Sequence, residues 1–366
     1  MDQFVADELE LLDAARRGDQ AAFERLVAAY RRELTAHCYR MLGSFHDAED
    51  AVQESLLSVW RAIPRFEGRS SLRTWLYRIC TNACLRLDTK RPKRLRSPDH
   101  GPPRHDTADL GEPVLGPVWL EPWPDDIASD EAGPAASYER RESVELAFVA
   151  ALQHLPAFQR AVLILREVLE YSAADVAALL DTTPAAVNSA LQRARKGAAD
   201  RMPARSQQAE LATLGPGGQR DLVDALVTAW ERADVDAVVA LLADDVRFTM
   251  PPLPAWFDGR DDVTRFLAER VFAIAWRLVP IAVAKAPATV GTKPAAPGEQ
   301  PGTVNGQPAL ASYQQQPDGR FLIGAILVLS VRDGRITELA SFLDPELYPR
   351  FGLPHELPAE KSGRER

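Results

Sequence analysis

The sequence predicts a multidomain protein in which two all-α parts precede an α+β part. Three observations carry this prediction. Apolar residues recur at helical spacing through residue 96, and two short helices are expected within residues 172–196. Strand-like apolar runs appear only after residue 302, behind further helical segments. A chain of 366 residues is long for one domain, so two or three domains are expected.

The first all-α part spans residues 7–96. Its opening helices are expected where apolar residues recur, at Leu9, Leu12, Phe23, Leu26, Val27 and Tyr30. Residues 46–60 predict an amphipathic helix with an acidic start, and the segment after it interleaves aromatic residues with arginines. Basic residues among aromatic ones suit single-stranded or melted DNA, whose bases stack and whose phosphates attract cations.

The charge is unevenly distributed along the chain. A net charge of -9 argues against a simple nucleic-acid coat protein. Residues 61–104 contain twelve Lys and Arg against three Asp and Glu, whereas residues 105–145 contain eleven acids against two Arg. A basic block before an acidic block indicates a DNA-contacting surface beside a segment that competes with DNA for it. The alternative is that both blocks are only solubilising surface.

The cysteines and the apolar content indicate the compartment. Cys38, Cys80 and Cys84 form no CxxC pair, so buried thiols in a reducing cytoplasm are expected. No run resembles a signal peptide, and no stretch is long enough to span a bilayer. We therefore expect a cytoplasmic protein with no membrane partner, no metal and no cofactor.

Residues 97–140 predict a linker, because proline is too frequent there for a packed domain. Within it, VWLEPWPDD at residues 118–126 places two tryptophans beside Asp125 and Asp126. This pattern favours a segment that anchors on a folded domain, and plain disorder is the alternative.

The second all-α part spans residues 141–202 and contains SAADVAALLDTTPAAVNSALQRARK at residues 172–196. Two short helices joined by a tight turn, the second ending in cations, predict a helix-turn-helix. Such a motif offers its second helix to the major groove of DNA. An ordinary helical hairpin with a polar outer face is the alternative.

Local signals mark both helices of this motif. Ser172 and Asp175 form a capping box for the first helix. Thr183 is a good cap for the second helix, and Pro184 suits its first position. Asp181 stands in the turn, where Asp tolerates a left-handed conformation better than most residues.

The third part spans residues 219–353. Residues 221–234 predict an amphipathic helix, and further helices are expected through residue 272. After a Pro/Gly/Ala-rich stretch at 287–302, three strand-like runs follow at Ala309–Gln315, Phe321–Arg332 and Arg335–Leu343. Asp333-Gly334 is a strong hairpin signal between the last two runs. Helices followed by a curved antiparallel sheet make an α+β layout, and the tail at 344–358 is expected to pack back on another domain.

Two segments resemble the extracytoplasmic-function (ECF) class of bacterial sigma factors. DAEDAVQESLLSVWRAIPRFEGRSSLRTWLYRICTN is similar to region 2 of that family, and LPAFQRAVLILREVLEYSAADVAALLDTTPAAVNSALQRARK is similar to its region 4. The resemblance implies a sigma factor that binds core RNA polymerase, at the β′ clamp and the β flap, and directs promoter-specific initiation. Region 2 would recognise the −10 element of promoter DNA and region 4 the −35 element.

The resemblance carries over to three sets of residues. The set expected to bind core polymerase is Asp47, Asp50, Gln53, Glu54, Leu57 and Trp60. The set expected at the −10 element is Phe66, Arg69, Arg73, Thr74, Arg78, Asn82 and Arg86. The set expected at the −35 element is Thr183, Pro184, Asn188, Ser189, Gln192, Arg193 and Lys196. Family members often carry Lys and Arg early in the recognition helix, where Asn188 and Ala190 stand here. Direct −35 readout is therefore expected to be weaker or to rest on Gln192, Arg193 and Lys196.

WERADVDAVVALLADDVRFTMPPLPAWFDGRDDV resembles the SnoaL-like branch of the nuclear-transport-factor-2-like fold, a cone that encloses a pocket. The residues that could line such a pocket are Trp230, Phe248, Met250, Trp256, Phe266 and Tyr313, with Asn305 and Gln307 nearby. Residues 219–353 contain no His, the commonest general base, so no catalytic residue is expected. We expect these aromatic residues to form an apolar core, and the more specific hypothesis is that they line a small-molecule pocket.

Three functions stay open. The first is a sigma factor whose C-terminal SnoaL-like domain modulates activity in cis, through an intramolecular contact at high effective concentration. The second is a DNA-binding regulator that acts without core polymerase, and pull-down of core polymerase by residues 1–204 separates the two. The third is a SnoaL-like enzyme or small-molecule binder with a DNA-targeting module, which turnover by residues 219–353 would support.

Overall fold

The computed structural model describes residues 2–125, 144–281 and 303–357, with side chains from residue 7 onward. The chain forms two compact units, the first of residues 1–94 and 147–202 and the second of residues 95–146 and 203–366. Several predicted features lie outside the described residues, namely Asp126, Pro358, linker residues 126–140, residues 141–143 and the stretch at 287–302. Among the residues described, no helix combines the length and the apolar composition needed to cross a membrane.

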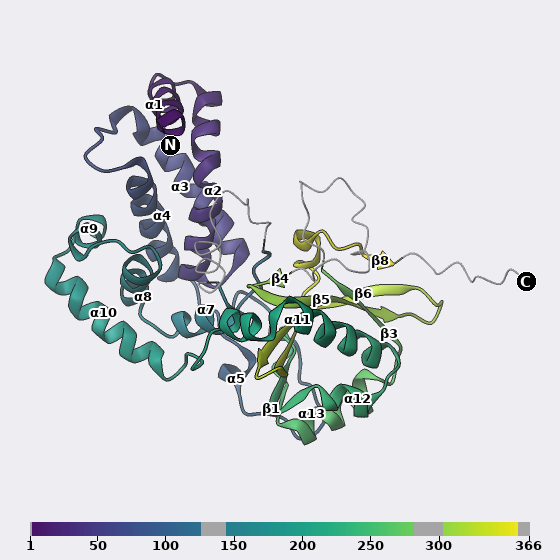
Figure 1. Cartoon of the computed structure of the whole chain (residues 1–366). Coiled ribbons are helices and arrows are strands. Elements are labelled where there is room, and N and C mark those ends of the chain that lie inside the picture. The colour runs from purple at the N-terminus through teal and green to yellow at the C-terminus, as the bar shows by residue number, and fades with distance from the viewer. Residues whose placement is uncertain (1, 126–143, 282–302, 358–366) are drawn as a thin grey trace, which may run out of the picture. The chain divides into compact units, whose positions relative to one another are not determined.

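Unit 1 begins with four helices, and side chains cap the starts of α2, α3 and α4 (Figure 1). The helices are α1 (Asp2–Arg16), α2 (Gln20–Leu42), α3 (Phe45–Ala62) with the 3-10 turn η1 (Ile63–Arg65), and α4 (Leu72–Asp88). The side chain that precedes each of α2, α3 and α4 accepts a hydrogen bond from a backbone amide in the first turn of that helix. These side chains are Asp19, Ser44 and Ser71, respectively. Gly43 ends α2 at a φ of 68°, which glycine adopts without strain and which allows α3 to start at once.

The second half of unit 1 contains the expected helix-turn-helix. Its elements are α7 (Leu146–Gln153), α8 (Ala157–Leu163) with the π-helical turn η2 (Ile164–Val168), α9 (Ala173–Leu179) and α10 (Pro184–Ala199). The capping box of Ser172 and Asp175 is present, and Thr183 caps α10. Asp181 adopts a φ of 51° in the turn. The local signals that predicted the motif are therefore confirmed.

Arg160 on α8 ties the second half of unit 1 to the first. Its side chain is 1% exposed and donates to the carbonyls of Leu152 at 2.9 Å, Leu155 at 3.0 Å and Met41. It also pairs with Asp88, the last residue of α4, at 2.9 Å. Because a buried guanidinium is costly unless its charge and its N–H groups are paired, these bonds hold α8 against α2 and α4.

Unit 2 is built on one sheet. Its strands in sheet order are β2 (Trp256–Asp258), β1 (Leu242–Thr249), β7 (Arg335–Phe342), β6 (Phe321–Arg332), β5 (Gln307–Gln315) and β3 (Trp276–Pro280), while β4 (Thr303–Val304) pairs with β5 and β8 (Glu356–Leu357) with β6. The three predicted runs form β5, β6 and β7, and Asp333-Gly334 makes the hairpin turn with both residues at positive φ. The expectation of an antiparallel sheet is wrong in one place, because β1 pairs with β7 in parallel.

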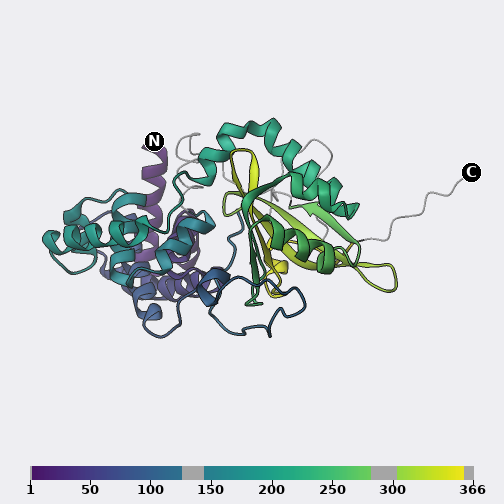
Figure 2. The same ribbon diagram turned by 90° about the horizontal axis from the view of Figure 1, so that it is seen from below.

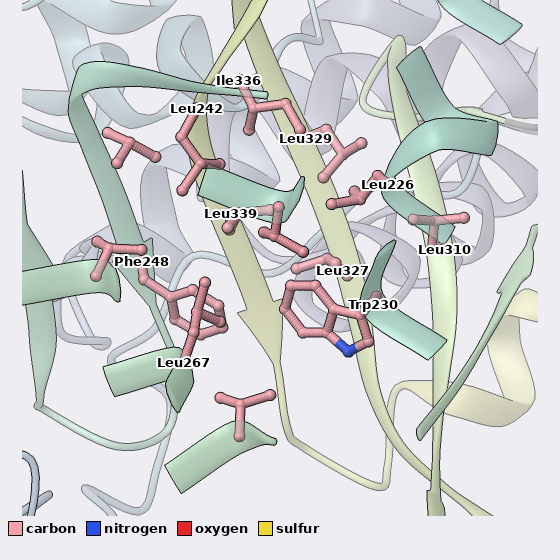
Figure 3. Packing of buried hydrophobic residues seen from close by; sticks show 14 of the residues in the cluster. Leu226, Trp230, Leu242, Phe248, Leu267, Leu310, Leu327, Leu329, Ile336 and Leu339 are labelled. Atoms are coloured by element: carbon pink, nitrogen blue, oxygen red, sulfur yellow. The ribbon is translucent and has the colours of Figure 1, made fainter. Parts of the chain in front are cut away.

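Helices cover one face of this sheet. They are α11 (Gln207–Glu231), α12 (Val235–Ala240) and α13 (Arg260–Phe266) with the π-helical turn η3 (Leu267–Val271). α11 bends at Gly215, ahead of Pro216, and then runs along the sheet (Figures 1 and 2). An apolar cluster fills the space between helices and strands, and Figure 3 labels Leu226, Trp230, Phe248, Leu327 and Leu339 among its members. Burial of this apolar surface holds the two layers together.

Residues 95–125 comprise the described part of the linker and the two residues before it, and they include α5 (Ser97–His100). Their first part contacts the other face of the sheet, whereas His105 and Thr107 bond to Asp262 on α13 and Glu269 in η3. Strand residues alternate between faces, so the neighbours of cluster residues on β7 and β2 point away from the cluster. Two such neighbours contact this segment. Glu338 on β7 pairs with Arg96, and the Nε1 of Trp256 on β2 donates to the carbonyl of Gly101 at 2.8 Å.

The C-terminal tail packs on its own sheet. Tyr348, in the 3-10 turn η4 (Tyr348–Phe351), donates its hydroxyl to the carbonyl of Gly324 at 2.7 Å. β8 pairs with the first residues of β6, a stretch that extends beyond the pairing of β6 with β7. The described part of the tail therefore packs on its own domain and not on another one as expected. The reason is that β7 leaves the backbone groups at the start of β6 unpaired, and β8 pairs with them.

His37 on α2 is buried and neutral. Its Nε2 lies 2.8 Å from the hydroxyl of Thr81, whose own proton is donated to the carbonyl of Tyr77 at 2.7 Å. The hydroxyl must therefore accept from His37, which fixes the tautomer with the proton on Nε2. Nδ1 is buried and has no hydrogen-bond partner within the described part of the chain. Burial, with the nearby charges of Arg40 and Arg73, lowers the pKa of His37 to about 3.

We expect His37→Gln to flatten the dependence of stability on acid pH. The pKa of His37 is about 3 in the folded protein and 6.5 for an ordinary histidine, so between these values the unfolded chain binds the extra proton. The free energy of unfolding therefore falls as the pH drops below about 6.5, by up to about 1.4 kcal/mol per pH unit from this group. Urea unfolding followed by circular dichroism at several pH values measures this slope. Equal slopes for wild type and variant would contradict the assignment.

Candidate polymerase and nucleic-acid interfaces

An exposed stripe runs along α3. Asp50, Gln53, Glu54 and Leu57 are three or four residues apart, and all four side chains are exposed. Leu57 is 59% exposed, which is unusual for a large apolar side chain beside carboxylates. Four of the six residues expected to bind polymerase therefore share one accessible face.

The other two residues of that set are engaged inside unit 1. Asp47 is 5% exposed and pairs with Arg94 at 2.6 Å and with Arg91. Its carboxylate thus holds the basic run after α4 against α3 and is not presented to a partner. Trp60 is partly buried, with its ring centroid 4.9 Å from that of Phe23.

The residues expected at the −10 element lie on α4 and just before it. Thr74 and Asn82 are partly exposed. Phe66, by contrast, is 8% exposed, and its ring centroid lies 4.8 Å from that of Trp75. Its carbonyl accepts a bond from Arg16. The expectation that Phe66 contacts DNA is not met in this structure, because the ring is packed inside the bundle.

Every arginine expected at the −10 element carries a carboxylate partner. The pairs are Arg69 with Glu67 at 3.1 Å, Arg73 with Glu33 at 2.7 Å, Arg78 with Asp181 at 2.9 Å, and Arg86 with Glu54 at 3.4 Å. Arg73 also lies over the ring of Tyr77, 5.0 Å from its centroid. Exposed ion pairs of this kind are weak, so a DNA phosphate can replace the carboxylate at Arg69, Arg78 and Arg86.

The residues expected at the −35 element form one outer surface of α10. Those exposed are Thr183, Pro184, Asn188, Ser189, Gln192, Arg193 and Lys196. Ala190 is 0% exposed and packs inward with Val187 and Leu191. The prediction that Ala190 faces DNA is therefore wrong, because the helical period places this residue on the core side of α10. Of the two positions that suggested weaker recognition of the −35 element, only Asn188 faces outward.

The six residues expected to line one pocket occupy two different places. Four of them belong to the apolar cluster, in agreement with the default expectation of an apolar core: Trp230, Phe248, Met250 and Phe266. Trp256 instead binds the linker, and its carbonyl accepts from the amide of Arg104 at 2.7 Å. Tyr313 donates its hydroxyl to the carbonyl of Pro354 in the tail at 3.1 Å. The expectation of one shared pocket is wrong for these last two residues.

Asn305 holds one point within the linker and one point just after it against the β4–β5 turn. Its Oδ1 accepts from the amide of Trp123 at 2.7 Å, and its own amide donates to the carbonyl of Trp123 at 2.9 Å. Its Nδ2 donates to the carbonyl of Val144 at 2.5 Å. The amide of Gly306 adds a bond to the carboxylate of Asp125 at 2.6 Å. Residues on both sides of the segment 126–143 are thus fixed to one turn.

Three further buried polar side chains extend this arrangement. Glu145 accepts from the amides of Gln207 at 2.9 Å and Gln208 at 2.7 Å, where its negative charge suits the N-terminus of α11. Gln307 accepts from the amide of Leu146 at 3.2 Å. The Oε1 of Gln207 accepts from the amide of Val331 on β6 at 2.7 Å. Linker, helix and sheet are therefore joined by fully buried hydrogen bonds.

The anchoring hypothesis for VWLEPWPDD agrees with the structure through Asp125. Trp119 is 7% exposed and Trp123 is 8% exposed, as anchored side chains are. Sequence reasoning missed the receiving turn, although the signal was present. Asn305-Gly306 is a two-residue hairpin dipeptide, and both residues adopt positive φ.

Metal binding has no support in the described ranges, where no group of three or more His, Cys, Asp or Glu side chains could hold an ion. Cys38, Cys80 and Cys84 are buried free thiols, as expected.

Family models match three stretches of the chain. Sigma-70 region 2 matches residues 26–93, sigma-70 region 4 matches residues 145–196, and the SnoaL-like domain matches residues 223–339. The crystal structure of Mycobacterium tuberculosis extracytoplasmic function sigma factor SigJ shares the fold, with a TM-score of 0.52 at 23% identity, over 89% of this chain and 98% of that one.

Curated relatives extend the similarity over nearly the whole length. The chain is 40% identical over 352 residues to the ECF RNA polymerase sigma factor SigG of Mycobacterium tuberculosis, covering 93% of this chain and 86% of the relative. It is 31% identical over 188 residues to the RNA polymerase sigma-H factor of Pseudomonas aeruginosa, covering 51% of this chain and 89% of the relative. With both sigma regions in order, followed by a SnoaL-like domain, the chain belongs to the ECF family of RNA polymerase sigma factors.

Proposed function

We propose that this sigma factor binds core RNA polymerase through the exposed stripe of α3 and grips the promoter at two places. The arginines of α4 contact the −10 element, and the outer surface of α10 reads the −35 element. One observation carries this assignment. Each surface is exposed, polar or cationic, and borne on a helix whose other side packs into unit 1. Such a protein acts in the cytoplasm, where core polymerase and promoter DNA are found.

Leu57→Ala is expected to weaken binding to core polymerase. Loss of an apolar contact of this size costs about 1–2 kcal/mol, which corresponds to roughly a five- to thirtyfold higher Kd. Leu9 on α1 is the matched control, because it is the same residue type at 58% exposure. Surface plasmon resonance with immobilised core polymerase measures both variants. Equal loss of affinity in the two would contradict the assignment of the stripe.

Lys196→Ala is expected to weaken binding to duplex −35 DNA about equally for all sequences. A lysine that neutralises one phosphate releases counterions, so its removal lowers the slope of log Kd against log salt by about 1. Arg201, a cation just beyond the end of α10, serves as the control. Fluorescence anisotropy at several salt concentrations gives the slopes. A slope unchanged in Lys196→Ala, or lowered equally in Arg201→Ala, argues against the predicted surface.

We further propose that the C-terminal domain modulates sigma activity by holding the linker. In sequence, the linker connects the two promoter-binding regions. The chain is bonded to the sheet at Arg96, just before the linker, and at Trp123 within it. A linker bound in this way is not free to follow the extended path between regions 2 and 4 on polymerase. The docked linker is therefore the restrained state, and core polymerase competes with the sheet for it.

Asn305→Gly is expected to raise transcription severalfold at limiting sigma concentration. Glycine accepts the φ of 55°, while two side-chain bonds are lost, one to Trp123 in the linker and one to Val144 just after it, which lowers the docking free energy by about 2 kcal/mol. Asp333→Gly is the control, since it is also a residue at positive φ in a hairpin of the same sheet. In vitro transcription is measured from a promoter identified by sequencing the transcripts that the protein initiates. Unchanged or lower output from Asn305→Gly would contradict restraint by the docked linker.

We also propose that the C-terminal domain acts by binding and not by catalysis. The support is chemical. Its central aromatic residues pack as an apolar cluster, and residues 219–353 contain no histidine.

A further inference from the structure

We propose that the turn of the helix-turn-helix masks the −10 surface of α4 in the free protein, with Asp181 occupying Arg78. This inference rests on the proposed −10 role of Arg78. It adds that a second promoter-reading element of the same chain competes with DNA for that arginine.

The masking contact is direct. The Nη2 of Arg78 donates to both carboxylate oxygens of Asp181, at 2.9 Å and 3.0 Å, between residues 103 positions apart in the chain. The two side chains are 45% and 73% exposed, so solvent and DNA reach them. A carboxylate in this position takes the place that a DNA phosphate needs and repels the approaching strand.

Neighbouring contacts keep the two regions together. The rings of Tyr77 on α4 and Tyr171 before α9 meet edge to face, with their centroids 6.1 Å apart. The Nε2 of Gln153 on α7 donates to the carbonyl of Arg40 on α2 at 3.2 Å. Together with the buried bonds of Arg160, these contacts place the turn against α4, so Asp181 does not need to supply the holding energy itself.

The backbone conformation of the turn suggests that the carboxylate of Asp181 has a role of its own. Asp181 adopts a φ of 51°, a conformation in which glycine is the residue without strain. Many such turns therefore use glycine. An aspartate at the same position keeps a slightly strained backbone and adds a carboxylate, and the structure directs that carboxylate at Arg78.

Binding to the promoter breaks this contact. Arg78 cannot bond a phosphate of the −10 element while Asp181 occupies its guanidinium. Region 4 must move to the −35 element, which is a separate site on the DNA. Free protein is thereby kept from −10 DNA, and the mask is removed when regions 2 and 4 take their separate places.

The test uses the full chain without polymerase. Asp181→Asn and Asp181→Gly both fit the turn and remove the charge. The measurement is fluorescence anisotropy with a single-stranded oligonucleotide carrying the −10 segment of a promoter that the protein initiates. An exposed ion pair is worth a factor of about two to five in an equilibrium constant, so both variants should lower the Kd by roughly that factor. Asp200→Asn, which removes an exposed carboxylate at the end of α10, controls for general charge and should change the Kd less.

A double-mutant cycle separates this inference from the function on which it rests. In an Arg78→Ala background, Asp181→Asn should have no effect on the Kd. An equal gain there, or no gain in the wild-type background, overturns masking. If Arg78→Ala does not weaken binding in the Asp181→Asn background, where the arginine is unmasked, the proposed −10 role fails instead. Masking is then judged by energy transfer between dyes at Lys90→Cys and Ala178→Cys, where binding of core polymerase must lengthen the distance and an unchanged distance overturns the proposal.

Discussion

Unit 2 depends on the hydrogen bonds that Asn305 makes across the β4–β5 turn. A side-chain amide satisfies the backbone of Trp123 and Val144 where neither belongs to a named strand. Buried backbone groups without partners are costly, so a Pro-rich segment lies against a sheet only if something supplies partners. Asn305 can do so because it sits at positive φ, which turns its side chain and its own amide toward the same residue. The linker thereby becomes part of the C-terminal unit and not a free connection.

The helices that we propose to face polymerase and DNA show a related constraint, in which many charges are paired within the protein itself. Many arginines of the basic block that suggested a DNA surface are paired with acids, among them Arg94 with Asp47, Arg73 with Glu33, and Arg96 with Glu338. Buried ion pairs position the helices. In an exposed ion pair, a DNA phosphate can replace the carboxylate. A count of charges along the sequence cannot separate these two classes, because the partners in these three pairs lie 40 to 242 residues apart in the chain. 

Local signals predicted local structure well. The caps at Ser172 and Thr183, the left-handed Asp181 and the Asp333-Gly334 hairpin follow from backbone preferences that a few neighbouring residues decide. β1 escaped prediction because two aspartates and a register shift break its alternation, and its parallel pairing with β7 is a long-range event. Burial of Phe66 and Asp47 and the inward direction of Ala190 likewise depend on which helix packs where. The common exposed face of Asp50, Gln53, Glu54 and Leu57 was predictable from their helical spacing, and their contact with polymerase stays a proposal.

Hydrogen–deuterium exchange along the linker tests the central claim most directly. The amides of Leu95, Leu120 and Trp123 are hydrogen-bonded in the docked linker, to Val118, to Leu95 and to Asn305. The account predicts slow exchange at these amides in the free protein and faster exchange once core polymerase is bound. Rapid exchange in the free protein, or protection that core polymerase leaves unchanged in a transcribing complex, would contradict it.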